Sequence, residues 1–204
     1  MFGRKKADQE SEVVETAPVG PGPHDVEAID LEDGVERLDL GGLLIGPSEG
    51  RELRLQVDEA SGQVQSVMVT SGEGALELKP FAAPRNGDLW SEIWPQIAED
   101  MRRRGGQVEE RDGEYGIELV GSVPVDVGNG EMREQPSRVV GVNGPRWMLR
   151  ATFLGKPAMQ PEGAGDWEDV LRAVVVNRGV QAMPVGDALP LRLPPNANRV
   201  SRAE

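Results

Sequence analysis

The sequence lacks cysteine altogether and has a single histidine, His24, and a single tyrosine, Tyr115, among its 204 residues. Without cysteine there is no disulfide, no thiolate metal site and no cysteine nucleophile, which favours a reducing compartment such as the cytoplasm. The histidine lies in a proline- and glycine-rich stretch, so a catalytic triad built on histidine is effectively excluded. We expect no catalytic residue, metal or cofactor. The chain favours a non-enzymatic role, although its 35 Asp and Glu leave carboxylate chemistry open.

Long apolar runs are also lacking. No stretch approaches 18 consecutive apolar residues, so the sequence predicts no transmembrane segment. The opening "MFGRKK" leads into a polar stretch, whereas a secretory signal needs an apolar run at that place. Together with the missing cysteine, these features predict a cytoplasmic protein.

Positive charge is scarce, and it is unevenly distributed. The formal net charge is −13, and residues 1–132 carry 12 Lys and Arg against 28 Asp and Glu, while residues 133–204 carry 10 against 7. An acidic total argues against a general nucleic-acid binder that neutralises phosphates. The basic surplus of the second half nevertheless allows a local interaction surface there.

Both ends of the chain have the composition of disordered tails. Residues 1–28 are polar, acidic and broken by prolines and glycines, so they bury too little apolar area to offset the entropy of ordering. A polar tail is also expected from residue 196 to 204. Between them, residues 29–195 are long enough for a single α+β domain with a sizeable core.

The segments between the tails alternate like strands or repeat like amphipathic helices. A helix is predicted from Asp88 as N-cap to Arg104, with Pro95 causing a kink or marking the true start. A second helix is predicted over 166–180, with Asp166 as its N-cap. Strands are predicted over residues 51–58, 64–70, 75–83, 107–113, 115–127, 137–142, 146–156, 180–185 and 189–195.

The order of these segments suggests a duplication. Residues 64–127 and 138–193 share the order strand, strand, helix, strand, strand, which fits a repeated β-β-α-β-β unit, although ordinary α+β order explains the likeness as well. Because two helices cannot cover so many strands on both faces, we predict a mostly antiparallel sheet with both helices on one side. The other face would then be partly open.

Basic residues gather on one strand of the second half. In "RWMLRATFLGK", alternation sends Trp147, Leu149, Ala151 and Phe153 to one face. It sends Arg146, Met148, Arg150, Thr152 and Lys156 towards the other. The second set forms a predicted arginine ridge. Its candidate binding residues are Arg146, Met148, Arg150 and Lys156, extended by Arg138 and Arg192 if their strands are neighbours. An arginine side chain can make bidentate contacts with carboxylate or phosphate, so the ridge could bind a partner. A solvated face whose arginines pair with the abundant Asp and Glu is the favoured explanation.

Several segments together resemble a known family. "GPRWMLRATFLGKPA", "DWEDVLRAVVVNRGV" and "AMPVGDALPLRLPP", with the opening "MFGRKK", resemble the actinobacterial domain family of unknown function numbered 3710. The resemblance covers roughly residues 30–195 and is most specific over 144–195. It implies a soluble cytoplasmic bacterial protein and carries over no catalytic residue.

The sequence therefore favours a binding or adaptor module that uses an open sheet face and its arginine ridge, with a protein as partner. A protein that binds nucleic acid or nucleotide through the same ridge is the alternative. An enzyme that uses carboxylates is favoured least.

Overall fold

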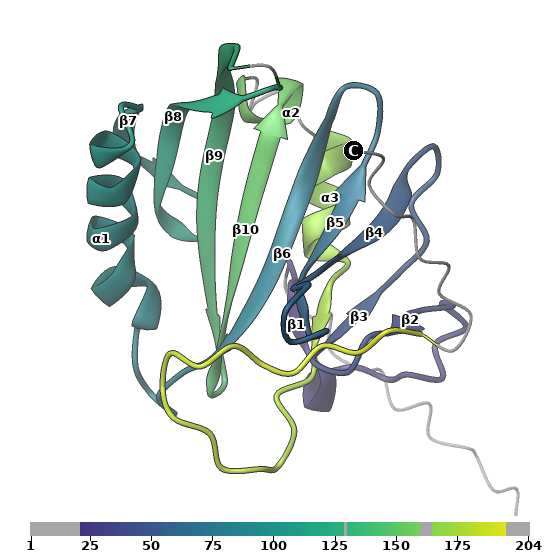
Figure 1. Ribbon diagram of the computed structural model, residues 1–204. Coiled ribbons are helices and arrows are strands. Elements are labelled where there is room, and N and C mark those ends of the chain that lie inside the picture. Colours follow the sequence, from purple (N-terminus) through teal and green to yellow (C-terminus); the bar gives the residue numbers. More distant parts are fainter. Residues whose placement is uncertain (1–20, 129, 160–164, 195–204) are drawn as a thin grey trace, which may run out of the picture.

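A seven-stranded antiparallel sheet forms the centre of the molecule (Figure 1). The computed structural model describes residues 21–128, 130–159 and 165–194. In sheet order the strands are β4 (Glu52–Val57), β5 (Val64–Thr70), β6 (Gly74–Ala82), β10 (Trp147–Gly155), β9 (Met132–Gly144), β8 (Gly116–Asp126) and β7 (Gln107–Gly113). Strand makes up 44% of the structure and helix 17%, so the predicted α+β class is confirmed.

The first helix, α1 (Leu89–Arg103), forms as its cap and stripe predict. The Asp88 carboxylate accepts a hydrogen bond from the backbone N–H of Ser91 at 3.0 Å and another from the Asn143 side chain at 2.6 Å. The helix begins ahead of Pro95 and continues through it. Apolar residues on both sides of Pro95 pack on β7, β8 and β9, and this packing offsets the hydrogen bond that proline cannot donate.

A smaller sheet and short helices accompany the large one. The small sheet has the order β1 (His24–Asp25), β11 (Val175–Val176), β3 (Leu43–Ile45) and β2 (Leu38–Asp39). The helices are the 3-10 turn η1 (Val26–Ala28), α2 (Lys156–Met159) and α3 (Gly165–Arg172). Trp167 and Leu171 of α3 join the core that lies on one face of the large sheet.

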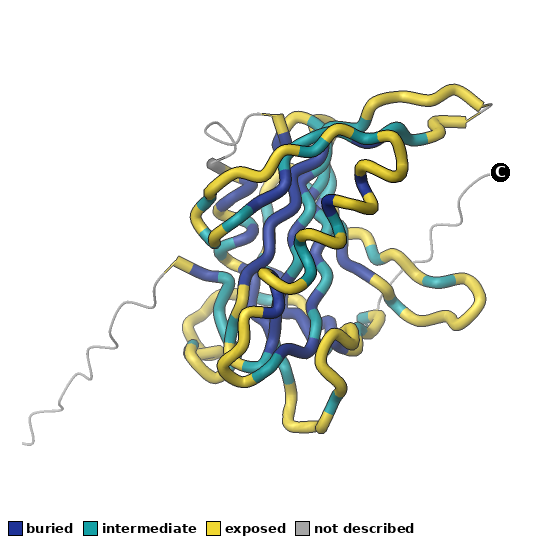
Figure 2. Tube along the Cα trace, turned by 90° about the vertical axis from the view of Figure 1, so that its left-hand side faces the viewer, coloured by how far each residue is buried: buried dark blue, intermediate teal, exposed yellow. Residues whose placement is uncertain are grey.

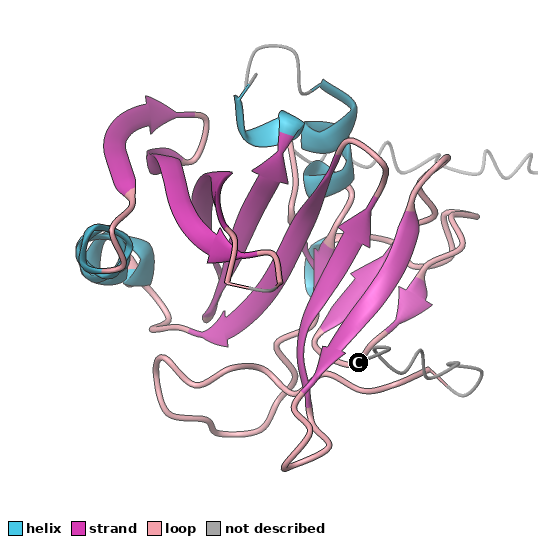
Figure 3. Cartoon of the chain, turned by 45° about the horizontal axis from the view of Figure 1, so that its top comes forward, coloured by secondary structure: helices cyan, strands magenta, loops and turns pink. Residues whose placement is uncertain are grey.

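Two separate cores lie on the two faces of the large sheet, and alternation in β10 divides them. Trp147, Leu149 and Phe153 belong to the core beneath α3 and the small sheet, whereas Met148 belongs to the core beneath α1. The two main helices therefore cover opposite faces, and the prediction that both lie on one side is wrong. The second face also carries apolar side chains, and α1 buries them at the β7 end of the sheet (Figure 3). Figure 2 shows buried residues concentrated in the middle of the strands, with exposed loops around them.

The segment after α3 departs from the predicted repeat. The helix predicted over 166–180 ends at Arg172, and β11 follows at once. Val174, Val175 and Val176 are buried, and a run of valines favours extended backbone at a buried position. Among the described residues the stretch 180–193 contributes only isolated bridges at Ala188 and Leu191. Among the described residues the second half thus lacks the two strands predicted after its helix, and the duplicated β-β-α-β-β unit is not confirmed.

The N-terminal boundary of the folded part also differs from the prediction. Residues 22–28 belong to the fold: β1 pairs in parallel with β11, and the Trp147 indole N–H donates to the Asp25 carboxylate at 2.6 Å. His24 is half-buried in this strand. Residues 1–20 and 195–204, which include most of the predicted tails, lie outside the described residues.

Candidate binding surface

α1 covers only part of its face of the sheet, and a groove runs beside it. The helix packs on β7, β8 and β9 and shares its core with Met148 of β10, while β6, β5 and β4 carry no helix on this face among the described residues. The groove has a volume of about 930 Å³. Its apolar wall and base include Phe81, Ile93, Ile97, Met148, Val123 and Val125, and its polar lining includes Gln56, Glu77, Arg150 and Thr152.

Two cations lie side by side on the sheet surface, and one of them, Arg150, lines this groove. Lys79 of β6 stands directly opposite Arg150 of β10 in the register of the sheet. Both side chains flank the Phe81 ring, with the charged groups 5.8 Å and 5.7 Å from its centroid. Within the described part of the chain, neither has a carboxylate within 4.0 Å. Like charges directly opposite each other on a sheet are destabilising, so this arrangement favours an anion between them.

The nearest acidic residue on the same strand is engaged elsewhere. Glu77 precedes Lys79 by two positions, which places both on one face of β6. The Ser66 hydroxyl lies 2.9 Å from the Glu77 carboxylate and 2.9 Å from the Gln56 side-chain oxygen. These contacts fix Glu77 toward β5 and β4. Glu77 therefore forms no direct ion pair with Lys79 or Arg150.

The structure brings together only two of the predicted ridge residues, Met148 and Arg150. Met148 is fully buried beneath the groove. Arg146 lies in the turn between β9 and β10 with a positive φ of 61°, and its carbonyl accepts hydrogen bonds from Ala83 and Arg178. Lys156 begins α2 and forms an ion pair with Glu73 at 2.6 Å.

Arg192 is also distant from the groove, since it pairs with Asp39 beside the small sheet. The residue that sequence reasoning missed is Lys79. Alternation in residues 75–83 places it on one face with Glu77 and Phe81, but the sequence does not show that β10 is the neighbour of β6.

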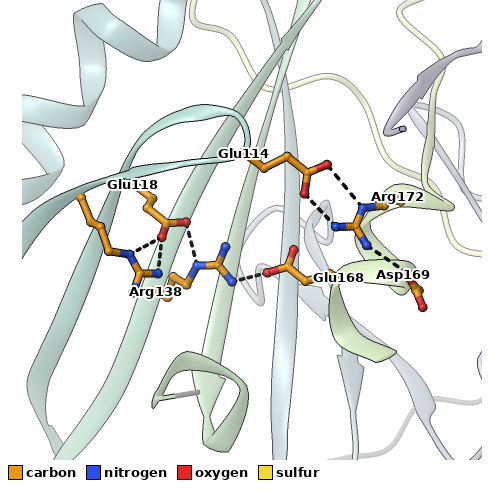
Figure 4. A network of polar contacts seen from close by, with 7 residues as sticks. Glu114, Glu118, Arg138, Glu168, Asp169 and Arg172 are labelled. Carbon is orange, nitrogen blue, oxygen red and sulfur yellow. Dashed lines mark hydrogen bonds and ion pairs between the residues drawn. The ribbon is translucent and has the colours of Figure 1, made fainter. Parts of the chain in front are cut away.

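Arg138 lies on the opposite face, inside a buried ionic network (Figure 4). It faces Phe153 in the register of the sheet, and its guanidinium donates to Glu118 at 2.8 Å and to Glu168 of α3. Arg111 also donates to Glu118, at 2.7 Å. Burial alone would lower the pKa of Arg138, but hydrogen bonds and charges from the two glutamates outweigh burial and raise its pKa. Arg138 thus fastens α3 to the sheet.

Two further contacts extend this ionic attachment at the turn between β7 and β8. Arg172 of α3 donates to Glu114 at 2.7 Å and to Asp169 at 3.0 Å. The neighbouring Tyr115 hydroxyl donates to the Gly22 carbonyl at 2.7 Å. Burial, and next the charge of Glu114, raises the pKa of Tyr115 to about 12, so the phenol stays protonated. These contacts join the sheet, α3 and the N-terminal segment.

The described residues show neither a metal site nor a membrane-spanning helix. No cluster of three or more His, Cys, Asp or Glu side chains in this part of the chain is placed to hold a metal ion. None of the helices observed there has the length and apolar character needed to cross a bilayer.

Fold and surface together define an α+β protein with one large antiparallel sheet. Among the described residues, part of one face of this sheet carries no helix and holds the paired cations Lys79 and Arg150. The chain belongs to the family described as "Protein of unknown function (DUF3710)", whose model matches residues 22–200. The family resemblance is therefore confirmed, while its actinobacterial character stays a prediction. Among curated proteins, no match was found.

Two solved structures show limited similarity to this fold. One is the solution structure of the cyanobacterial PsbP protein, CyanoP, of Synechocystis sp., with a TM-score of 0.40 and 11% identity over 70% of this chain and 92% of that one. The other is a crystal structure from Bacteroides thetaiotaomicron, with a TM-score of 0.39 and 9% identity over 70% of this chain. The alignment spans about half, 48%, of that second protein. Similarity this low carries no argument about function.

Proposed function

We propose that this protein is a non-enzymatic binding or adaptor module whose uncovered sheet face receives a protein partner. The observation that carries the proposal is the cation pair of Lys79 and Arg150, which stands without a carboxylate partner in the described part of the chain, beside an apolar groove wall. An arginine guanidinium suits the planar, bidentate geometry of carboxylates, and a lysine adds a compact charge beside it. The proposal includes the cytoplasmic location expected from the sequence.

A nucleic-acid or nucleotide ligand is the alternative for the same cations, because they can also contact phosphate. The net charge of −13 opposes it, since phosphate binding depends on neutralising many charges. An enzyme that uses carboxylates ranks last, because the two carboxylates that line the groove are engaged: Glu77 with Ser66, and Asp100 with Arg103 and Arg104.

The test is capture from a bacterial lysate by the tagged full-length protein, with and without nuclease treatment. The binding variant is Lys79→Glu with Arg150→Glu. The matched control is Arg103→Glu with Lys156→Glu, which changes the net charge equally at exposed positions away from the cation pair. We expect bound proteins that persist after nuclease, are lost from the binding variant and are kept by the control. Bound material that disappears with nuclease supports the alternative, and equal capture by both variants refutes this surface.

A further inference from the structure

The uncovered part of the sheet has the width of one α-helix. The strip from β10, whose Met148 already lies in the core beneath α1, to β4 carries no helix on this face among the described residues, and strands in a sheet are about 4.8 Å apart. The strip is therefore roughly 14 Å wide between its outermost strands. A helix with its side chains is about 10–12 Å in diameter, and packed helices lie about 8–10 Å apart. One further helix fits beside α1.

Half-buried apolar side chains lie along this strip, as they do where a helix packs on a sheet. Ile93 and Ile97 on the flank of α1 are only half-buried and line the groove, and Phe81 lies half-buried on the sheet beside them. Gly186, in the loop before Ala188, also lines the groove. Apolar side chains therefore line the side next to α1, where a second helix would place its own apolar stripe.

The charge of the strip sets the chemistry of its occupant. The cation pair lies among the strands that α1 leaves uncovered, and its mutual repulsion falls only if negative charge is placed between or above the two groups. The two carboxylates that line the groove have other partners: Glu77 accepts a hydrogen bond from Ser66, and Asp100 pairs with Arg103 and Arg104 at the end of α1. An occupant with carboxylates at the point where it faces Lys79 and Arg150 therefore complements the strip better than a neutral or basic one.

We propose that the partner docks through an acidic amphipathic helix that lies on the sheet beside α1. Its apolar stripe packs against Phe81, Ile93 and Ile97, and its carboxylates contact Lys79 and Arg150. Residues three or four apart lie on one helix face. A helix with acidic and apolar residues at this spacing can therefore contact the cation pair and the apolar groove wall at the same time. This inference rests on the proposed function and adds the conformation and charge of the bound segment.

The test is a display selection of random 16-residue peptides on the full-length protein. Peptides that also bind the variant Lys79→Glu with Arg150→Glu are removed. We expect the survivors to carry Asp or Glu together with apolar residues at three- and four-residue spacing. Measured by fluorescence anisotropy, a survivor should bind the intact protein at least ten times more tightly than the variant. Exchanging its Glu for Gln, or placing Pro in its middle, should weaken it by a similar factor.

Attachment of a bulky group gives a second measurement that does not depend on charge. The chain contains no cysteine, so Thr152→Cys, which lines the groove, takes a single maleimide label. The control is the same label on Gly72→Cys, an exposed position in the loop between β5 and β6. The protein labelled at residue 152 should lose the survivors, while the protein labelled at residue 72 should keep them. Thermal melts of each variant confirm that the fold is kept.

The results separate this inference from the proposed function. Some survivors could need the cation pair and the groove but lack acidic residues or apolar residues at helical spacing. Such survivors refute the acidic helix but not the binding surface. Binding of an RNA oligonucleotide to the intact protein but not to the charge-reversed variant, with no surviving peptide, refutes both in favour of a phosphate ligand. Self-association by light scattering that the charge-reversed variant abolishes identifies a second copy as the occupant and refutes the partner helix. Peptide binding that is unchanged by the label in the groove refutes the surface itself.

Discussion

Replacement of Arg138 by methionine should destabilise the protein strongly, because it leaves buried carboxylates without their partner. The side chains of Glu118 and Glu168 are only 3% and 10% exposed, and both contact Arg138. Glu118 keeps Arg111, whereas Glu168 loses its ion-pair partner, and its other carboxylate oxygen has no hydrogen-bond partner among the described residues. Breaking a buried ion pair from one side costs about 3–5 kcal/mol.

A loss of about 4 kcal/mol is a large part of the roughly 5–15 kcal/mol that stabilises a protein of this size. It corresponds to a fall in Tm of roughly 8–16 °C. The assay is urea unfolding followed by tryptophan fluorescence, with a thermal melt alongside. Arg133→Met on the same strand is the control, since its ion pair with Glu131 is exposed and should change stability by less than about 1 kcal/mol.

A second substitution tests the reason for the loss. In Arg138→Met with Glu168→Leu the uncompensated carboxylate is gone, so more than half of the lost stability should return. A single variant within about 1 kcal/mol of the intact protein, or a double variant no more stable than the single one, would refute the reasoning. Because Arg138 lies on the face opposite the groove, the folded variant should still bind the partner.

Further predictions concern the single histidine and a glycine beneath α1. Burial, and next the charge of Arg37, lowers the pKa of His24 below its usual 6.5, so the folded state binds its proton less readily than the unfolded state. The stability that His24 contributes is present above pH 6.5 and is lost as pH falls through 6.5 towards the folded pKa. NMR titration of the one imidazole measures that pKa, and urea unfolding at pH 7.5 and 5.5 measures the loss of stability. The variant His24→Gln should remove this loss. At Gly141 an added Cβ would overlap the Trp90 ring, so Gly141→Ala should lower the free energy of unfolding by about 1–3 kcal/mol, or more if the ring cannot shift. Gly72→Ala, with open space around it, is the control in the same urea assay, and equal stability of the two variants would contradict the packing argument.

Local patterns in the sequence predict the local structure well. The N-cap at Asp88 and the apolar spacing predict α1, and alternation correctly places Trp147, Leu149 and Phe153 on one face of β10. These features depend on residues that are close in sequence, where helix and strand periodicity act directly. The α+β class follows from them.

Properties that depend on long-range pairing are not accessible in this way. The sequence groups Arg138 with Arg150, but the register of Arg138 opposite Phe153 turns it to the other face, and a shift of one residue reverses every side chain of a strand. Long-range pairing also hides Lys79, since the pairing of β6 with β10 joins segments about seventy residues apart. The candidate surface therefore requires the strand order, which no local pattern contains.

The N-terminal strand β1 pairs in parallel with β11 and covers an edge that could otherwise pair with other chains and cause aggregation. A shortened chain that begins at residue 29, where the composition suggests the folded part should start, would leave one edge of β11 without its neighbour. It would also remove the Asp25 carboxylate from the buried Trp147 indole. An unpaired edge of apolar valines is a template for pairing with other chains, so such a protein should be less soluble than one that retains residues 21–28.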